Sequence, residues 1–116
     1  MLAMKRTSTA ALARQYDQLR RSLAHLGYIS QGSVLDRSTL HPPRSGYQWT
    51  RKVARKTITV ALSPEQFDSL SQAVANRRTL QKTIAKMEQL SRQILFDTLP
   101  DARRRKPLGK KVLGLI

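Results

Sequence analysis

The feature that most constrains the fold is a long stretch without helix-breaking residues. Between Pro64 and Pro100 the sequence contains neither glycine nor proline, and apolar residues recur there with the spacing of an amphipathic helix. Ser63, Pro64 and Gln66 are typical of a helix start, with serine as the cap, proline at the first helical position and glutamine completing a capping box. The sequence therefore predicts a helix over residues 64–98, about 50 Å long if it is continuous.

A second amphipathic helix is predicted near the N-terminus. Leucine and tyrosine side chains recur at spacings of three and four within residues 8–26, which places them on one face of a helix. Ser8 or Thr9 is expected to cap its start, and Gly27 is expected to end it in a left-handed conformation. At about 28 Å, this helix is too short to cover the longer one.

The apolar stripe of the longer helix therefore needs further cover. The stripe is interrupted at residues 76–78, which leaves two alternatives: a helix that breaks there and folds back as a hairpin of two helices, or one long helix, with room for a bend there, that pairs in a coiled coil. We favour the long helix, packed on the N-terminal helix and on a second copy of the chain. The expected homodimer would use the stripe side chains Leu70, Val74, Leu80, Ile84, Met87 and Ile94.

Between the two helices the sequence changes to turn residues and short alternating segments. Residues 27–46 predict a connector with one short strand within residues 28–35. Residues 47–62 alternate around a short basic segment, which predicts a β-hairpin. Its turn is expected at Ala54-Arg55 or at Arg55-Lys56, or as a longer loop with a bulge, because neither pair contains the glycine or asparagine that two-residue turns favour.

With a two-residue turn the two faces of this hairpin differ in character. Trp49 then shares one face with Val60 or Leu62, and this face, including Tyr47, is expected to belong to the core rather than to stack on nucleic-acid bases. The opposite face is polar, and Lys52 lies on it with the uncharged residues Gln48, Thr50, Thr57 and Thr59.

These segments predict an α+β protein that is mostly α. We expect a single small domain over residues 1–100 and a basic tail over residues 101–116 with an apolar end. Leucine, isoleucine and valine should form most of a thin core. The aromatic side chains are expected to pack individually in this core, and they are Tyr16, Tyr28, Tyr47, Trp49, Phe67 and Phe96.

The charge of the chain indicates its partner. Twenty-two lysine and arginine residues against seven acidic ones give 116 residues a net charge of +15. Segments 1–29, 30–62 and 101–116 each carry an excess of four or five positive charges, whereas segment 63–100 carries an excess of one. Self-repulsion of this size favours a polyanionic partner, and nucleic acid is the first candidate.

The basic residues expected to contact nucleic acid form three groups, at the hairpin, in the long helix and in the tail. A two-stranded ribbon can enter the major groove of DNA while residues at its tip hold phosphates. The predicted contact residues are Arg44, Arg51, Lys52, Arg55, Lys56, Arg77, Arg78, Arg103, Arg104, Arg105, Lys106, Lys110 and Lys111.

Catalysis, cofactors and metals are not expected. The chain has no cysteine, and His25 and His41 have no carboxylate pair at ligand spacing. It contains no P-loop, no GxGxxG and no nucleophile elbow. No apolar run reaches the roughly 18 to 20 residues of a membrane span, and the absence of cysteine fits a reducing compartment, so we expect a cytoplasmic protein without a membrane partner.

Short motifs follow one another in a recognisable order. They are Gly32-Ser33-Val34, Gly46-Tyr47-Gln48-Trp49, Arg51-Lys52-Val53, Lys56-Thr57, Leu62-Ser63-Pro64-Glu65 and Asn76-Arg77-Arg78-Thr79-Leu80, with Leu90 beyond them. In this order the chain, from about Tyr16 to Leu99, resembles a small bacterial family of uncharacterised proteins often encoded beside insertion-sequence transposases. The resemblance implies a helix, a glycine-containing link, an aromatic hairpin and a long helix. Many relatives carry a cysteine-rich cluster before the hairpin and a glycine in its turn, both absent here.

The function expected from these observations is that of a DNA-binding accessory protein. The alternatives are an RNA-binding protein associated with a ribosome or phage, and an adaptor whose long helix binds a protein such as a transposase. In the adaptor, the apolar end of the tail, residues 112–116, would dock on a protein surface.

Overall fold

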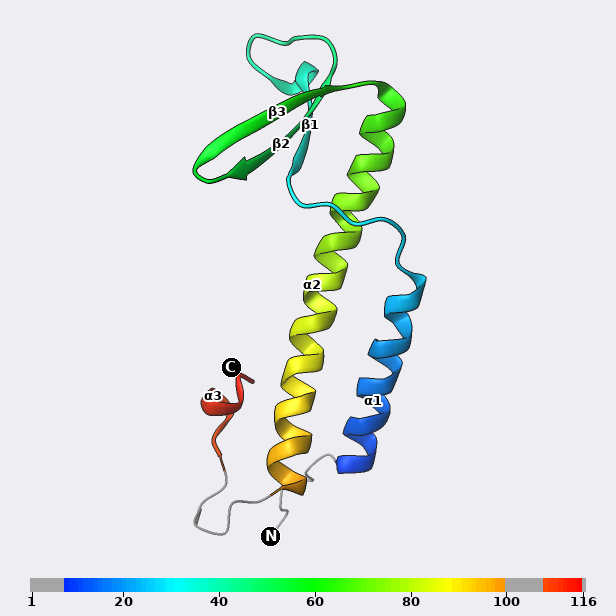
Figure 1. The fold of residues 1–116 in the computed structure, drawn as a ribbon, viewed down its shortest axis with the longest axis vertical. Coiled ribbons are helices and arrows are strands. Elements are labelled where there is room, and N and C mark those ends of the chain that lie inside the picture. The colour runs from blue at the N-terminus through cyan, green and yellow to red at the C-terminus, as the bar shows by residue number, and fades with distance from the viewer. Residues whose placement is uncertain (1–7, 100–107, 116) are drawn as a thin grey trace. The chain divides into compact units, whose positions relative to one another are not determined.

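The computed structural model describes residues 8–99 and 108–115 (Figure 1). The chain is α+β and mostly α, as the sequence predicts. In chain order the elements are α1 (Thr9–Ser22), the short 3₁₀ helix η1 (Leu23–His25), β1 (Ser33–Asp36), the 3₁₀ helix η2 (Arg37–Thr39), β2 (Tyr47–Val53), β3 (Lys56–Leu62), α2 (Pro64–Thr98) and α3 (Lys110–Leu113).

The chain divides into two compact units, each described by itself. The first contains the described residues up to His25 and from Lys82 onward, and the second contains residues 26–81. Helix α2 contributes its N-terminal half to the second unit and its C-terminal half to the first. The single domain expected over residues 1–100 stays a prediction.

Helix α2 is one uninterrupted helix of 35 residues. It begins with the predicted capping box: the Ser63 backbone N–H donates to Gln66 Oε1 at 2.9 Å, and the Gln66 N–H donates to Ser63 Oγ at 3.1 Å. The alternative of a break at residues 76–78 is wrong. Asn76 remains helical, and its side-chain amide donates to the backbone carbonyl of Tyr28 at 2.9 Å. The stripe is therefore interrupted where Asn76 makes a polar contact with the link that precedes the sheet, residues 26–32.

Helix α1 starts as predicted and ends differently. The Ser8 hydroxyl accepts a hydrogen bond from the Ala11 N–H at 3.1 Å, as an N-cap does. The predicted left-handed end at Gly27 is wrong, because the helix tightens into the 3₁₀ turn Leu23–His25 before reaching it. Gly27 instead allows a close approach, since a Cβ there would lie 3.3 Å from the side-chain nitrogen of Asn76.

The sheet has three antiparallel strands in the order β1-β2-β3. Its turn is Ala54-Arg55, one of the two predicted positions, and Trp49 lies opposite Val60 as one of the predicted registers requires. Strand β1 adds to the free edge of the predicted hairpin, with Val34 opposite Trp49. The backbone N–H of Ser30 in the link donates to the Ala73 carbonyl of α2 at 3.1 Å.

Few side chains are fully buried. Among the described residues the buried apolar ones are Leu12, Ala73, Val74 and Leu90. Two aromatic residues expected in the core are exposed, Tyr28 by 92% and Phe96 by 49%. For Tyr28 the contact with Asn76 is made by its backbone carbonyl, which leaves the ring outside. No described helix combines the length with the apolar character needed to cross a membrane.

Leu90 should contribute far more to stability than its neighbour Leu95 on the same helix. Leu90 is 1% exposed and Leu95 is 53% exposed. We expect Leu90→Ala to lower the free energy of unfolding by about 2–5 kcal/mol, because the substitution leaves a cavity. Leu95→Ala should cost less than about 1 kcal/mol. Urea unfolding followed by circular dichroism measures both, and equal losses would contradict the packing described.

Candidate nucleic-acid interface

The turn of the hairpin has an unusual backbone. Ala54 and Arg55 have φ angles of 48° and 68°, so both lie in the left-handed region that a two-residue turn of this type requires. Glycine normally occupies these positions because it lacks the Cβ, which costs about 1 kcal/mol or more in this region, and asparagine and aspartate occupy them because their short polar side chains offset that cost with local hydrogen bonds. The chain thus has a strained turn with an arginine at its second position.

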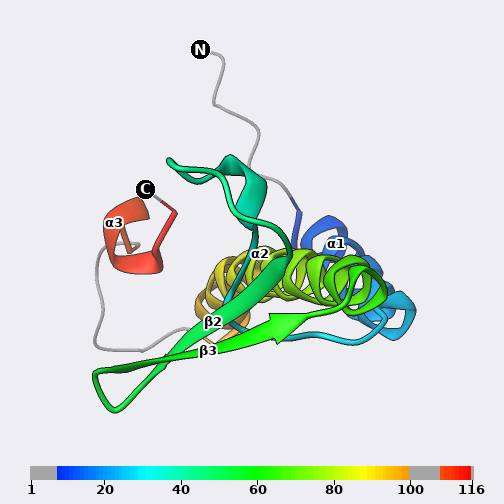
Figure 2. The same ribbon diagram turned by 90° about the horizontal axis from the view of Figure 1, so that it is seen from above.

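Three exposed cations surround this turn. Lys52 pairs with Thr57 on the polar face, Lys56 pairs with Val53 on the opposite face, and Arg55 lies in the turn itself. None of the three forms an ion pair with any other residue that the structure describes. Figures 1 and 2 both show the turn away from the first turns of α2. We call Lys52, Arg55 and Lys56 the basic tip.

Arg51 has a different role from its neighbours in the basic tip. It is half-buried, and its guanidinium carbon lies 5.8 Å from the centre of the Trp49 ring, a cation–π distance. The Trp49 indole N–H donates to the Gln31 carbonyl at 3.0 Å. Gly32 has a φ of 105°, and a Cβ there would lie 2.5 Å from Trp49 Nε1. The link therefore holds the indole in place, and Arg51 packs on it.

The face that contains Trp49 is covered only near the base of the hairpin. Tyr47 stacks on Phe67 of α2, with ring centres 4.3 Å apart and an interplanar angle of 25°. Toward the turn, Val53, Ile58 and Val60 are 37%, 39% and 44% exposed. The prediction that the whole face is core is therefore wrong. The physical reason is that the strands extend past the residues of α2 and the link that cover their base.

On the polar face the structure adds a basic residue that sequence reasoning missed. Arg37 Nε donates to Gln48 Oε1 at 3.2 Å, and the Arg37 N–H donates to the Gly46 carbonyl at 2.9 Å. Next to it, the hydrogen bond from the Ser38 hydroxyl, joined by one from the Ser38 N–H, holds the pKa of the Asp36 carboxyl below its usual value. Asp36 followed by Ser38 is the sequence signal of such a turn, which returns the loop to the sheet.

The other predicted contact residues do not join the basic tip. Arg44 is exposed in the loop before β2, separated from the turn by the length of that strand, about 20 Å. On α2, Arg77 is half-buried and Arg78 is exposed. Lys110 and Lys111 are exposed on α3, which belongs to the other unit. The remaining predicted residues, Arg103, Arg104, Arg105 and Lys106, lie outside the described residues.

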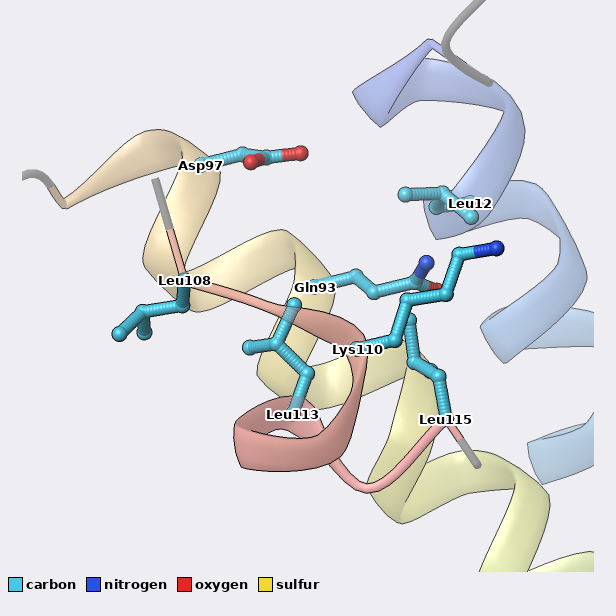
Figure 3. Close-up of a pocket in the computed structure, with 7 residues that line it drawn as sticks. All are labelled: Leu12, Gln93, Asp97, Leu108, Lys110, Leu113 and Leu115. Atoms are coloured by element: carbon cyan, nitrogen blue, oxygen red, sulfur yellow. The ribbon is translucent and has the colours of Figure 1, made fainter. Parts of the chain in front are cut away.

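The apolar end of the tail docks on its own chain. Arg92 Nε of α2 donates to the Leu113 carbonyl, and Gly114 ends α3 with a φ of 76°. The side chains of this segment line a cavity of about 260 Å³ together with residues from α1 and α2 (Figure 3). The lining residues are Leu12, Gln93, Asp97, Leu108, Lys110, Leu113 and Leu115. In this conformation Leu113 and Leu115 face the protein's own helices.

Residues 8–99 and 108–115 contain no cluster of three histidine, cysteine or acidic side chains that could hold a metal ion. Chemically, the three exposed cations of the basic tip lie within five residues of one turn and form a region of positive potential that attracts anions.

No family model, curated protein or solved structure matches this chain. The resemblance to proteins encoded beside transposases therefore stays a prediction.

Replacing Ala54 should relieve strain without changing charge. We expect Ala54→Asn to raise the free energy of unfolding by about 0.5–1 kcal/mol, because asparagine tolerates the left-handed region better than alanine. The same substitution at Ala61, which lies in regular strand, should lower it. Thermal unfolding of the two variants distinguishes these effects, and a destabilised Ala54→Asn variant would contradict the turn geometry.

Proposed function

We propose that this protein binds nucleic acid, and duplex DNA in the first place, through phosphate contacts made by the basic tip. The observation that carries the proposal is Arg55. This residue has a φ of 68° in an exposed turn, and it has no ion-pair partner among the described residues. Glycine at this position would make the hairpin more stable. A strained residue whose charge has no ion-pair partner in the described part of the chain fits a residue that serves to bind an anion.

The hairpin also has the form that duplex binding requires. A two-stranded ribbon fits the width of the major groove, and phosphates line both edges of that groove. Thr57 and Thr59 on the polar face are exposed and carry hydroxyl groups that can donate to or accept from base edges. Arg51 is half-buried and packs on Trp49, so the proposal assigns the phosphate contacts to the basic tip and not to Arg51. The tip supplies the phosphate contacts, and the polar face supplies modest selectivity.

In this proposal the rest of the positive charge is auxiliary. The basic tail, which includes Lys110 and Lys111, adds contacts that do not depend on sequence. The protein acts as a cytoplasmic accessory factor of bacterial DNA, in the manner of proteins that accompany a mobile element. The proposed adaptor function is weaker, because Leu113 and Leu115 of its docking segment line a cavity with residues of α1 and α2 of the same chain, and Arg92 of α2 donates to the Leu113 carbonyl.

Affinity for duplex DNA should depend steeply on salt. If the tip and tail neutralise about six to ten phosphates, the association constant should fall by roughly 10³ to 10⁵ between about 50 and 200 mM salt, because counterions are released on binding. Fluorescence anisotropy with a labelled duplex measures this. Competition with structured RNA at one salt concentration shows which nucleic acid is preferred. If the affinities for duplex DNA and for structured RNA are both independent of salt, the proposal is excluded. If RNA competes more strongly than duplex DNA, the nucleic acid that the protein binds is RNA.

Arg55→Gly should stabilise the protein and weaken its binding at the same time. The free energy of unfolding should rise by about 1 kcal/mol because the strain at φ 68° is relieved. The duplex affinity should fall about five- to tenfold, and the slope of the salt dependence should decrease by about one, because one phosphate contact is lost.

The matched control is Ala54→Asn, which relieves strain at the neighbouring position and keeps all three cations of the basic tip. It should raise stability and leave the affinity unchanged. If both variants bind as the natural chain does, the turn has no part in binding. If both bind more weakly, turn conformation rather than the charge of Arg55 determines affinity, and the proposed phosphate contact is wrong.

A further inference from the structure

Strand β3 forms an open edge of the sheet. In the order β1-β2-β3 it has a neighbour on one side only, and six of its seven residues, from Lys56 to Ala61, are exposed. No backbone hydrogen bond from another described segment reaches its outer side. It contains no proline and no bulge, and Lys56, at its end, is its only charged residue. Natural proteins usually block such an edge, because its unpaired backbone groups bind another strand.

The turn determines which backbone groups are free at this edge. In a hairpin closed by a two-residue turn the flanking residues, Val53 and Lys56, direct their backbone groups toward each other, and the direction alternates along the strand from there. The N–H and C=O groups of Thr57, Thr59 and Ala61 therefore point away from β2. These three residues present six backbone groups to the outer edge.

We propose that two copies of this chain associate through β3, paired antiparallel about a two-fold axis at Thr59. Thr59 then pairs with Thr59 of the second copy, and Thr57 pairs with Ala61. In this register Thr57, Thr59 and Ala61, whose backbone groups point outward, are the residues that form hydrogen bonds between the two copies. All seven residues of each strand lie opposite a residue of the other strand. Moving the axis to a neighbouring residue leaves unpaired residues at the ends of the strands.

The side chains agree with this register. Ile58 of one copy lies opposite Val60 of the other, which covers two apolar side chains that are 39% and 44% exposed in the single chain. The two Thr59 side chains meet on the polar face, where threonine pairs form hydrogen bonds across strands. Lys56 lies opposite Leu62, so the only charged residue of the strand does not meet its own copy.

The stripe of α2, expected from the sequence to form a homodimer, offers less free surface. Of its six side chains only Ile84 is exposed, by 43%, while Val74 is buried and the other four are half-buried. An isologous contact needs one patch that is free in both copies. Strand β3 meets this condition from Lys56 to Ala61, which favours the sheet edge as the dimer surface.

Association through β3 would also place two basic tips on one six-stranded sheet. Along the strand direction, the two Arg55 residues would be eight residue positions apart, roughly 27 Å. Two linked weak sites bind more tightly than either alone. This consequence rests on the proposed function, whereas the pairing itself does not. In the dimer the two tips would contact phosphates from outside the groove, because a hairpin whose β3 edge is paired is no longer a two-stranded ribbon.

Disulfide trapping tests the register, because the natural chain contains no cysteine. In an antiparallel ladder the Cα atoms of a hydrogen-bonded pair are about 5.5 Å apart, a distance that a disulfide can span. We expect Thr59→Cys to form a covalent dimer under mild oxidation at tens of micromolar protein. Thr57→Cys is the matched control and should remain mostly uncrosslinked, because Ala61 of the second copy lies opposite it.

Sedimentation equilibrium tests association without a crosslink. The natural chain should show twice its mass of 13.2 kDa at tens of micromolar. Thr59→Pro should shift the mass to that of the monomer. Proline lacks the N–H that points outward at this position, and its introduction leaves the hydrogen bonds between β3 and β2 in place. Thr59→Ala keeps that N–H and should remain dimeric. Circular dichroism and Trp49 fluorescence show whether the Thr59→Pro variant is folded.

Several results would overturn the proposal. A monomeric natural chain excludes it, as does a dimer that survives Thr59→Pro or crosslinks equally at positions 57 and 59. A dimer that is lost in Ile84→Asp and kept in Thr59→Pro would assign association to α2 instead. Because none of these measurements includes nucleic acid, a failure here leaves the proposed DNA contact of Arg55 standing.

Discussion

The two-residue turn at Ala54-Arg55 is the constraint on which the proposed nucleic-acid site of this protein depends. It sets the register of β2 against β3, which places Trp49 opposite Val60 and Lys52 opposite Thr57. A shift by one residue would exchange the two faces, so that the indole would leave the cover of the link and α2. The same turn determines which backbone groups of β3 point outward. The polar face, the basic tip and the open edge therefore all follow from one local conformation.

That conformation is unfavourable for the residues that adopt it, and contacts elsewhere must maintain it. The base of the hairpin is held by the Tyr47–Phe67 stack and by the hydrogen bond from the Trp49 indole to the link. The link in turn is bound to α2 through Ser30 and Asn76. Anchored in this way, the strands can carry an alanine and an arginine where glycine and asparagine are usual. The contacts at the base of the hairpin therefore offset the unfavourable backbone conformation of Arg55 in the turn.

The parts of the fold that sequence reasoning predicted are those decided by neighbouring residues. The capping box of α2 involves Ser63 and Gln66 only, and the Ser8 cap involves the next three residues, so their chemistry can be recognised without a fold. The hairpin register needs only the alternation of side chains and a turn length. Failures occurred where a distant segment intervened. Asn76 interrupts the stripe because it binds the Tyr28 carbonyl, a contact over 48 positions that no local pattern indicates.

The candidate site divides in the same way. The sequence by itself determined that the chain is strongly basic, that it contains a hairpin with cations near its turn, and that a long helix follows. Only the tertiary structure decided which of these cations are exposed and where they lie. It packs Arg51 on Trp49, adds Arg37 to the polar face through β1 and its loop, and places Arg44 at the opposite end of β2 from the turn. Charge is a property of each residue, whereas the exposure of a charge depends on what the rest of the chain packs against it.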